Sequence, residues 1–187
     1  MDEELAYEAS QLDRDVVAPD QIRTVIKTFR DKLFTEIFPG RTDVPKTLIY
    51  AKDDSHAEDI VKIVREEFGK GNDFAQKITY KTTGMSTDDL IASFRNSYNP
   101  RIAVTVDMIS TGTDIKPLEI VLFLRTVNSR SYFEQMKGRG VRVINDNDLQ
   151  SVTPDAKSKT HFIIVDAVGV CENDKTDSAP MERKRSV

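Results

Sequence analysis

Two arginines in the last third of the sequence carry the side chains best suited to chemistry on a phosphate group. Arg139 and Arg142 belong to the octet QMKGRGVR, which also holds Gln135 and Gly138 in the pattern Q-x-x-G-R-x-x-R. A guanidinium group stays charged and presents a planar fork of donors, so it can neutralise charge that develops on a transferred phosphoryl group. If a helix continues through Arg142, the two arginines share one face. The alternative is a solvated basic helix end, where arginines complement the helix dipole and glycines end the helix.

A second polar segment, VDMISTGTDI, directly follows the apolar run IAVTV. In this segment Gly112 would let the backbone approach a phosphate, and Ser110 and Thr111 could donate their hydroxyl groups. Asp114 could accept from a ribose hydroxyl or orient an arginine. Taken alone, the segment fits an ordinary turn of small polar residues equally well.

Five short apolar runs alternate with helical patterns and must position both polar segments. The runs are TLIYA (residues 47–51), KITY (77–80), IAVTV (102–106), EIVLFL (119–124) and HFIIVDAV (161–168). Because they are apolar throughout, they predict a parallel sheet covered by helices on both faces, and hence an α/β fold. Ligands of such sheets bind beyond the carboxyl ends of the strands. Both polar segments come after the carboxyl end of a predicted strand.

Apolar residues at helical spacing predict a helix over residues 20–38. Cap-like spacings predict three further helix starts, at Ser55 to Glu58, Ser86 to Asp89 and Ser131 to Glu134. The polar stretch over residues 145–159 predicts an exposed loop. Single side chains are assigned structural roles: His56 and His161 have no catalytic partner nearby, and four aromatic residues are predicted in the core, namely Tyr50, Phe74, Tyr80 and Phe94.

The composition argues for a cytoplasmic protein that contacts no membrane. The sequence has one cysteine, Cys171, no run of apolar residues long enough to span a bilayer, and no signal peptide at its start. No Cys/His cluster has the spacing of a zinc site, so we expect no metal ligands. The net charge of −4 argues weakly against a nucleic-acid partner, but a basic patch over residues 125–142 reverses that expectation.

These motifs resemble a known family in order as well as in type. TLIYAKDDSHAE, VTVDMISTGTDI and YFEQMKGRGVR look like motifs IV, V and VI of the second motor lobe of superfamily 2 helicases and translocases. Three longer segments, RNSYNPRIAVTVDMISTGTDIKPLE, SRSYFEQMKGRGVRVI and THFIIVDAVGVCE, resemble the restriction (R) subunit of type I restriction-modification enzymes. The resemblance covers roughly Leu12 to Glu172.

The resemblance implies a RecA-like three-layer domain and a role for each matching residue. Arg139 and Arg142 would be arginine fingers, and the nucleotide would lie against Gln135, Gly138, Gly112 and Asp114. Contacts to nucleic-acid backbone would come from Lys52, Thr83, Ser110 and Thr111. The implied cofactors are ATP and Mg²⁺, and the implied partner is double-stranded DNA.

The resemblance also implies what lies elsewhere in a longer polypeptide. The sequence has no G-x-x-x-x-G-K-[ST] loop and no acidic D-E-x-H-like box, so ATP and Mg²⁺ would be bound mainly by a first RecA-like lobe. Modification (methyltransferase) and specificity subunits are further expected partners. The isolated chain is expected to be inactive.

We expect residues 1–40 to be a helical segment packed on the lobe, 41–171 the lobe itself, and 172–187 a flexible tail or linker. Two alternatives to a restriction-enzyme motor remain at this point. One is a stand-alone nucleic-acid-binding module, and the other is the lobe of another superfamily 2 DNA helicase. A domain that binds a mononucleotide at its strand ends is a third reading, which would bind weakly without a phosphate-cradling loop.

Overall fold

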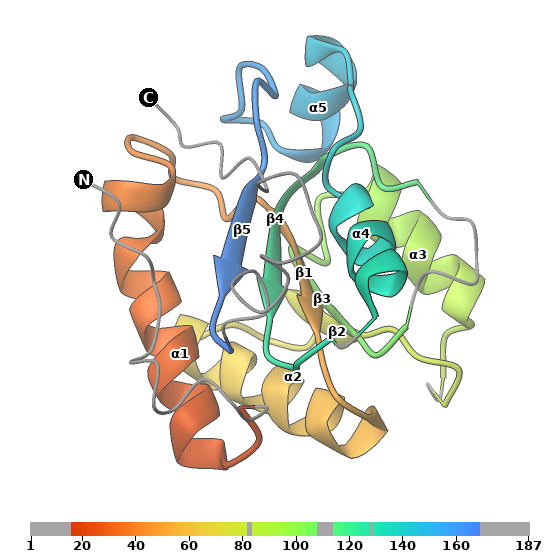
Figure 1. Ribbon diagram of the computed structural model, residues 1–187. Coiled ribbons are helices and arrows are strands. Elements are labelled where there is room, and N and C mark those ends of the chain that lie inside the picture. The colour runs from red at the N-terminus through yellow and green to blue at the C-terminus, as the bar shows by residue number, and fades with distance from the viewer. Residues whose placement is uncertain (1–15, 82–83, 108–113, 128, 169–187) are drawn as a thin grey trace.

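The computed structural model describes residues 16–81, 84–107, 114–127 and 129–168. Within them, one parallel sheet has the strand order β2-β3-β1-β4-β5 (Figure 1). The strands are β1 (Lys46–Tyr50), β2 (Ala75–Lys77), β3 (Ile102–Thr105), β4 (Leu118–Phe123) and β5 (Ile163–Asp166). The predicted α/β class and parallel sheet are confirmed.

Strand β1 is the centre of the sheet. Its last residue, Tyr50, is in register with Thr105 of β3 on one side and with Phe123 of β4 on the other. Every residue of these three strands is buried, which is why most of their residues are apolar and do not alternate with exposed polar ones. The two charged exceptions, Lys46 and Glu119, are held by buried polar contacts.

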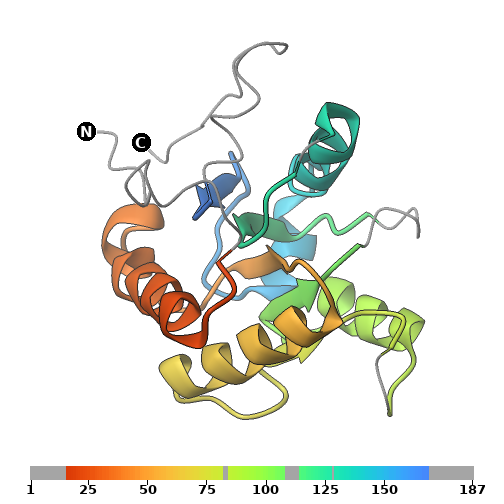
Figure 2. The same cartoon turned by 60° about the horizontal axis from the view of Figure 1, so that its bottom comes forward.

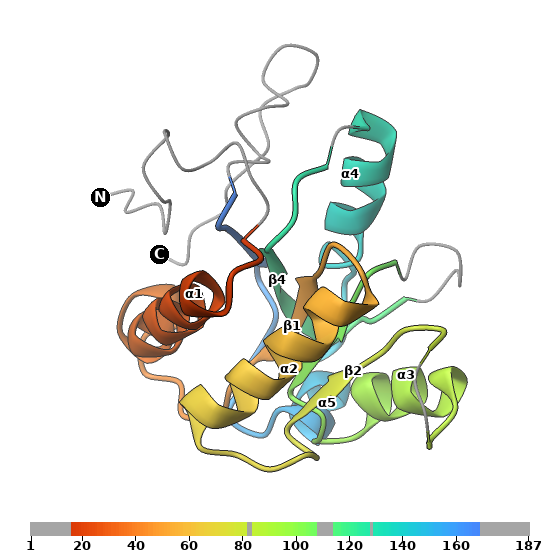
Figure 3. The same cartoon turned by 90° about the horizontal axis from the view of Figure 1, so that it is seen from below.

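Helices cover both faces of the sheet and make three layers. Helices α1 (Pro19–Lys32) and α2 (Asp54–Phe68) lie on one face, and α3 (Thr87–Asn96), α4 (Arg130–Gly138) and α5 (Asp146–Val152) lie on the other (Figures 2 and 3). Helix α1 widens into a π-helix over Leu33–Ile37, closed by the bond from Phe38 N–H to Leu33 O at 2.8 Å. The predicted helix over residues 20–38 is therefore confirmed from residue 20 to residue 37.

Two helices start earlier than their sequence patterns predict. Asp53 rather than Ser55 caps α2, because its carboxylate accepts from His56 N–H at 2.8 Å. Ser129 rather than Ser131 caps α4, accepting from Tyr132 N–H at 3.3 Å. In both cases the first polar side chain in extended backbone takes the capping bond, and the later serine lies inside the helix. The cap at Ser86 is confirmed.

The predicted loop over residues 145–159 contains helix α5. Asn145 caps it by accepting from Asp148 N–H at 2.8 Å, and Leu149 and Val152 are buried. Two apolar residues three positions apart suffice to bury one side of a two-turn helix, although most of its surface is polar.

The edge strand β2 ends sooner than the predicted strand over residues 77–80. Lys77 and Thr79 turn toward α2, where both bond the carboxylate of Asp54, at 3.2 and 2.7 Å. The turn exposes 86% of Tyr80, so the prediction of a core role for this residue is wrong. The other three aromatic residues predicted there, Tyr50, Phe74 and Phe94, are buried.

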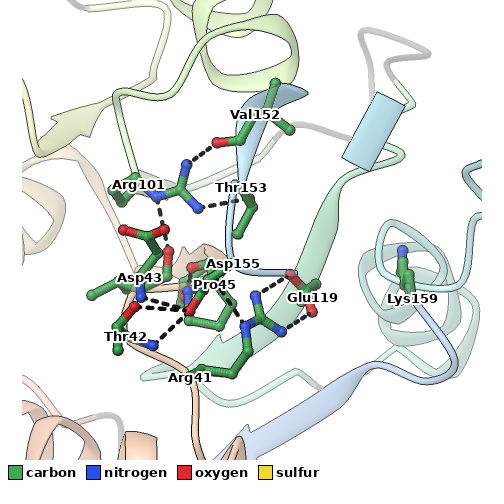
Figure 4. A network of polar contacts seen from close by, with 12 residues as sticks. Arg41, Thr42, Asp43, Pro45, Arg101, Glu119, Val152, Thr153, Asp155 and Lys159 are labelled. Carbon is green, nitrogen blue, oxygen red and sulfur yellow. Dashed lines mark hydrogen bonds and ion pairs between the residues drawn. The ribbon is translucent and has the colours of Figure 1, made fainter. Parts of the chain in front are cut away.

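A network of buried charges joins α5 to the amino ends of the strands (Figure 4). The Arg101 guanidinium donates to Val44 O at 2.8 Å, to Val152 O at 2.5 Å and to Thr153 Oγ1 at 2.7 Å. Beside it, Arg41 donates to both carboxylate oxygens of Glu119 at 3.0 Å. Arg41 also pairs with Asp155 at 3.2 Å, and Asp155 follows α5. The network ties the segment after α4 to the body of the sheet.

We predict that Glu119→Ala lowers the free energy of unfolding by about 2 kcal/mol. Glu119 is 1% exposed, so its removal leaves one side of the Arg41 guanidinium buried and unsatisfied, while Asp155 retains the other. The matched control is Glu36→Ala, which breaks the exposed Lys32–Glu36 pair and should cost less than about 0.5 kcal/mol. Urea unfolding measures both variants. Equal losses of unfolding free energy in the two variants would show that the buried Arg41–Glu119 pair stabilises the fold no more than the exposed pair does.

Candidate functional site

Lys52 lies at the carboxyl end of β1, on a loop held by His56. The backbone N–H of Lys52 donates to His56 Nδ1 at 2.9 Å, so His56 Nε2 carries the proton and donates to Val16 O at 2.5 Å. His56 is buried and has the structural role predicted for it. The Lys52 side chain itself is exposed at this edge of the sheet.

Helix α4 is seated on the sheet by aromatic packing. Phe133 and Met136 are buried, and the Phe133 ring lies 5.3 Å from that of Phe123, which stacks on Tyr50 at 5.4 Å. The Tyr50 hydroxyl donates to Met136 O at 3.3 Å. These contacts fix the helix that carries Gln135, whose side chain is exposed.

Helix α4 ends before it reaches Arg142. Its last residue is Gly138, and the chain then turns through bonds from Gly140 N–H to Lys137 O at 3.0 Å and from Val141 N–H to Gly138 O at 3.3 Å. The condition under which Arg139 and Arg142 would share one helical face, a helix that continues through Arg142, is therefore not met. The bonds that tighten the last turn end the α-helix, and Gly140 fits against the ring of Phe162.

Arg142 is nevertheless held by a residue of the other polar segment. Its guanidinium pairs with the Asp114 carboxylate at 2.9 Å, with 54% and 43% of the two side chains exposed. This contact matches the expectation that Asp114 could orient an arginine. Because an exposed ion pair contributes little to stability, its clearest consequence is the orientation of a guanidinium that remains accessible from solvent.

Arg139 lies beside the end of the central strand. It is half-buried, and its positive charge acts on the Tyr50 hydroxyl. Burial raises the pKa of Tyr50, and the charge of Arg139 opposes that rise. Tyr50 thus stays protonated and available to donate to α4.

A third group of side chains at this edge was missed by sequence reasoning. Tyr132 of α4 lies near Asp107, which follows β3, and the Arg125 guanidinium, which follows β4, lies 5.8 Å from the centre of the Tyr132 ring. Burial raises the pKa of Tyr132, and the negative charge of Asp107 raises it further. The available signal was position: Asp107 directly follows a predicted strand, and Tyr132 precedes Gln135 by three residues, close to one helical turn.

Four of the predicted site residues, Thr83, Ser110, Thr111 and Gly112, lie outside the described residues. Within the described part of the chain, no group of three His, Cys, Asp or Glu side chains could hold a metal ion. None of the helices described there is long and apolar enough to cross a membrane.

The sequence model of the family described as helicase conserved C-terminal domain matches residues 23–144. The chain belongs to this family. The match includes β1 to β4, the Asp114–Arg142 pair and helix α4, so the resemblance inferred from the motifs is confirmed.

Endonuclease subunits of type I restriction enzymes are among the similar proteins. The chain is 30% identical over 177 residues to the type I restriction enzyme EcoKI endonuclease subunit of Escherichia coli K12, covering 91% of this chain and 14% of that protein. It is 30% identical over 149 residues to the EcoAI endonuclease subunit of Escherichia coli, covering 73% of this chain and 17% of that protein. The chain thus spans less than a fifth of these relatives.

Solved structures agree on the fold. A fragment structure of an HsdR subunit of a type I restriction enzyme from Vibrio vulnificus superposes with a TM-score of 0.59 at 23% identity, covering 84% of this chain and 30% of that chain. At this identity the likeness shows a shared fold, in keeping with the RecA-like architecture expected from the sequence.

The two glycines of the helicase motif differ in what surrounds them. A Cβ added at Gly140 would lie 2.7 Å from Phe162 Cδ2, whereas one added at Gly138 would meet no atom within 4 Å. We predict that Gly140→Ala lowers the free energy of unfolding by about 1–3 kcal/mol through this overlap. Gly138→Ala, at the end of α4, should be neutral or stabilising by up to about 1 kcal/mol. Thermal unfolding of the two variants tests the difference, and an unchanged Gly140→Ala protein would contradict the packing argument.

Proposed function

We propose that this chain is the second motor lobe of an ATP-dependent duplex-DNA translocase that works within a type I restriction endonuclease. The observation that carries the proposal is the exposed Arg142 guanidinium, oriented by Asp114 at 2.9 Å, three residues beyond Arg139 in a helicase C-terminal domain. The restriction endonuclease subunits among the relatives support the choice of enzyme class.

The arginines would act on a nucleotide bound between this lobe and a first lobe of the same polypeptide. Bound ATP, with Mg²⁺ held by the first lobe, supplies the phosphoryl group that is transferred to water. The Arg142 side chain is accessible enough to reach such a nucleotide, and the half-buried Arg139 would complete the fork. Both arginines are expected to neutralise negative charge on the oxygens of the phosphoryl group as it is transferred.

Asp114 would keep Arg142 in place while the cleft is open. Because Arg142 is more than half exposed, its long side chain would otherwise sample many rotamers, and ordering it at each turnover would cost conformational entropy. Gln135 and Gly138, both near the end of α4, would line the same wall. A Gly138→Ala variant that folds normally but slows ATP turnover would support that placement.

DNA would be held through its backbone at the carboxyl edge of the sheet. Lys52 is exposed there, on the loop that His56 fixes, and Thr83, Ser110 and Thr111 are proposed as further contacts. Contacts to phosphates carry no sequence information, as a motor that moves along arbitrary DNA requires. Site recognition and methylation would belong to specificity and modification subunits.

A triplex-displacement assay tests the proposal with the full-length protein and the subunits that accompany it. Translocation along linear duplex DNA should strip a third strand only when ATP is present, and a more distant third strand should be released later. ATP-independent, salt-sensitive binding without displacement would instead favour a nucleic-acid-binding module. Strand separation without displacement of the triplex would favour another superfamily 2 helicase.

A further inference from the structure

We propose that Tyr80 and Lys81 bind the sugar-phosphate backbone of DNA, with the Tyr80 ring packed on a deoxyribose and the Lys81 ammonium on the adjoining phosphate. The inference rests on the proposed DNA motor and adds two residues to its DNA-binding surface. Three observations carry it: the exposure of Tyr80, its contact with Lys81, and the hydrogen bonds that fix the turn on which both residues lie.

Tyr80 is exposed although it follows the strand β2 closely. The residue is 86% exposed, whereas Ile78 and Thr79, the two residues before it, are buried. Burial of apolar surface is the main stabilising contribution of an aromatic ring, so the fold gains little from a ring that is left in water. An exposed ring at this position is instead available for a contact outside this chain.

Thr79 holds the turn that presents Tyr80. The Thr79 hydroxyl donates to the Asp54 carboxylate at 2.7 Å and accepts from Lys81 N–H at 3.3 Å. The Thr79 carbonyl accepts from the Thr87 hydroxyl at 3.1 Å. These bonds join the turn to the first residues of α2 and α3. Because the backbone of the turn is already ordered, a ligand that binds Tyr80 and Lys81 has little of it left to immobilise.

The two side chains together match the chemistry of a nucleic-acid backbone. The Lys81 ammonium lies 5.8 Å from the centre of the Tyr80 ring, so a positive charge and an apolar surface are adjacent. Lysine and tyrosine side chains are among those that contact the phosphate and sugar of DNA, and such contacts carry no sequence information. The pair therefore suits a motor that moves along arbitrary DNA.

The turn lies at the edge of the sheet that is proposed to face DNA. Lys52 follows β1 and Tyr80 follows β2, and because the strands are parallel, both lie beyond the carboxyl ends of the sheet. In Figure 1 the segments that follow β1 and β2 are both at the lower edge of the sheet. Asp88 and Asp89, in the first turn of α3, keep this surface from being broadly basic. We therefore expect Lys81 to contact one phosphate rather than a long stretch of backbone.

A contact to another protein is the alternative role for an exposed tyrosine. The centre of a protein–protein interface is depleted in charged residues, and lysine is among the residues that such interfaces disfavour. The ammonium of Lys81 beside the Tyr80 ring therefore favours the DNA backbone.

The test measures the binding of a fluorescent linear duplex to the full-length protein over a range of salt concentrations, with a non-hydrolysable ATP analogue present. Lys81→Ala should weaken binding and reduce the slope of log K against log salt by about 0.9, the value for one phosphate contact. Tyr80→Ala should weaken binding about fivefold at every salt concentration and leave the slope unchanged, because the ring carries no charge. Tyr80→Phe, which keeps the ring, should bind like the wild-type protein.

Lys70→Ala is the matched control for the loss of a charge. Lys70 is exposed between the end of α2 and the start of β2, at the opposite edge of the sheet, so its removal should change neither affinity nor slope. Binding that is unchanged in both Tyr80→Ala and Lys81→Ala would overturn the inference and leave a protein partner as the role of this turn. Equal losses in Lys81→Ala and Lys70→Ala, or in Tyr80→Phe and Tyr80→Ala, would also overturn it. A wild-type protein that fails to bind duplex DNA at low salt would overturn the proposed motor function itself.

Discussion

Replacing Arg139 with alanine in the full-length protein is expected to slow ATP turnover by about 10³-fold, while ATP binding largely survives. The reason is that an arginine finger acts on charge that develops during phosphoryl transfer, whereas most of the binding contacts would lie on the first lobe. Single-turnover hydrolysis measures the chemical step, and binding of a fluorescent ATP analogue measures affinity.

Arg130→Ala is the control for this result. Arg130 is exposed at the first position of the same helix, so its removal takes away a positive charge from α4 at the end opposite Arg139. Turnover in Arg130→Ala should stay near the wild-type rate. Turnover that is retained in Arg139→Ala would refute the finger assignment, because alanine cannot replace the charge of the lost guanidinium.

Arg142→Ala should slow turnover by about 10²-fold or more, and Asp114→Ala should have a smaller effect. Arg142 would contact the nucleotide directly, whereas Asp114 would act only by orienting it through the 2.9 Å ion pair. Because the pair is exposed, neither variant should lose much folding stability, so thermal unfolding separates a functional loss from a structural one.

The double variant Asp114→Ala/Arg142→Ala decides whether the pair works as one unit. If Asp114 acts through Arg142, the double variant turns over ATP no more slowly than Arg142→Ala. A double variant that is slower by the product of the two single effects would mean that Asp114 has a separate role, such as a contact to the ribose.

The parallel sheet and its helices could be predicted because burial dictates their sequences. The strands β1, β3 and β4 are buried at every position, which favours apolar residues, and a buried charge such as Lys46 or Glu119 is tolerated only with a polar partner. Helix α1 was predictable for a related reason, since Ile22, Val25, Ile26 and Phe29 all face the interior.

The elements that differ from the sequence-based predictions lie where individual polar contacts determine the structure. The start of α2 depends on whether Asp53 or Ser55 first reaches a free backbone N–H, and nothing in their residue types distinguishes them. Tyr80 is exposed because Thr79 bonds Asp54 of α2 and ends the strand, a contact between residues 25 positions apart. Helix α5 is held by Arg101 from the start of β3, which local sequence does not reveal.

The candidate site was predictable in its residue types but not in its geometry. Asp114 and Arg142 were both recognised, and their contact brings the two polar segments together. Whether the helix continues through Arg142 was left open by the sequence; it ends at Gly138, and Gly140 in the following turn packs against Phe162, 22 residues away. The grouping of Tyr132 with Arg125 was missed because each residue alone has an ordinary role at a strand end or on a helix.

ATP hydrolysis by the full-length protein, measured with and without duplex DNA, decides whether this chain belongs to a DNA-driven motor. The subunits that accompany the protein are kept in place, and the salt concentration is varied. We predict that duplex DNA raises turnover, that the rise shrinks as salt weakens phosphate contacts, and that Arg139→Ala abolishes it. Turnover that is absent, or that is the same with and without DNA at low salt, would contradict the assignment of this chain to a DNA-driven motor.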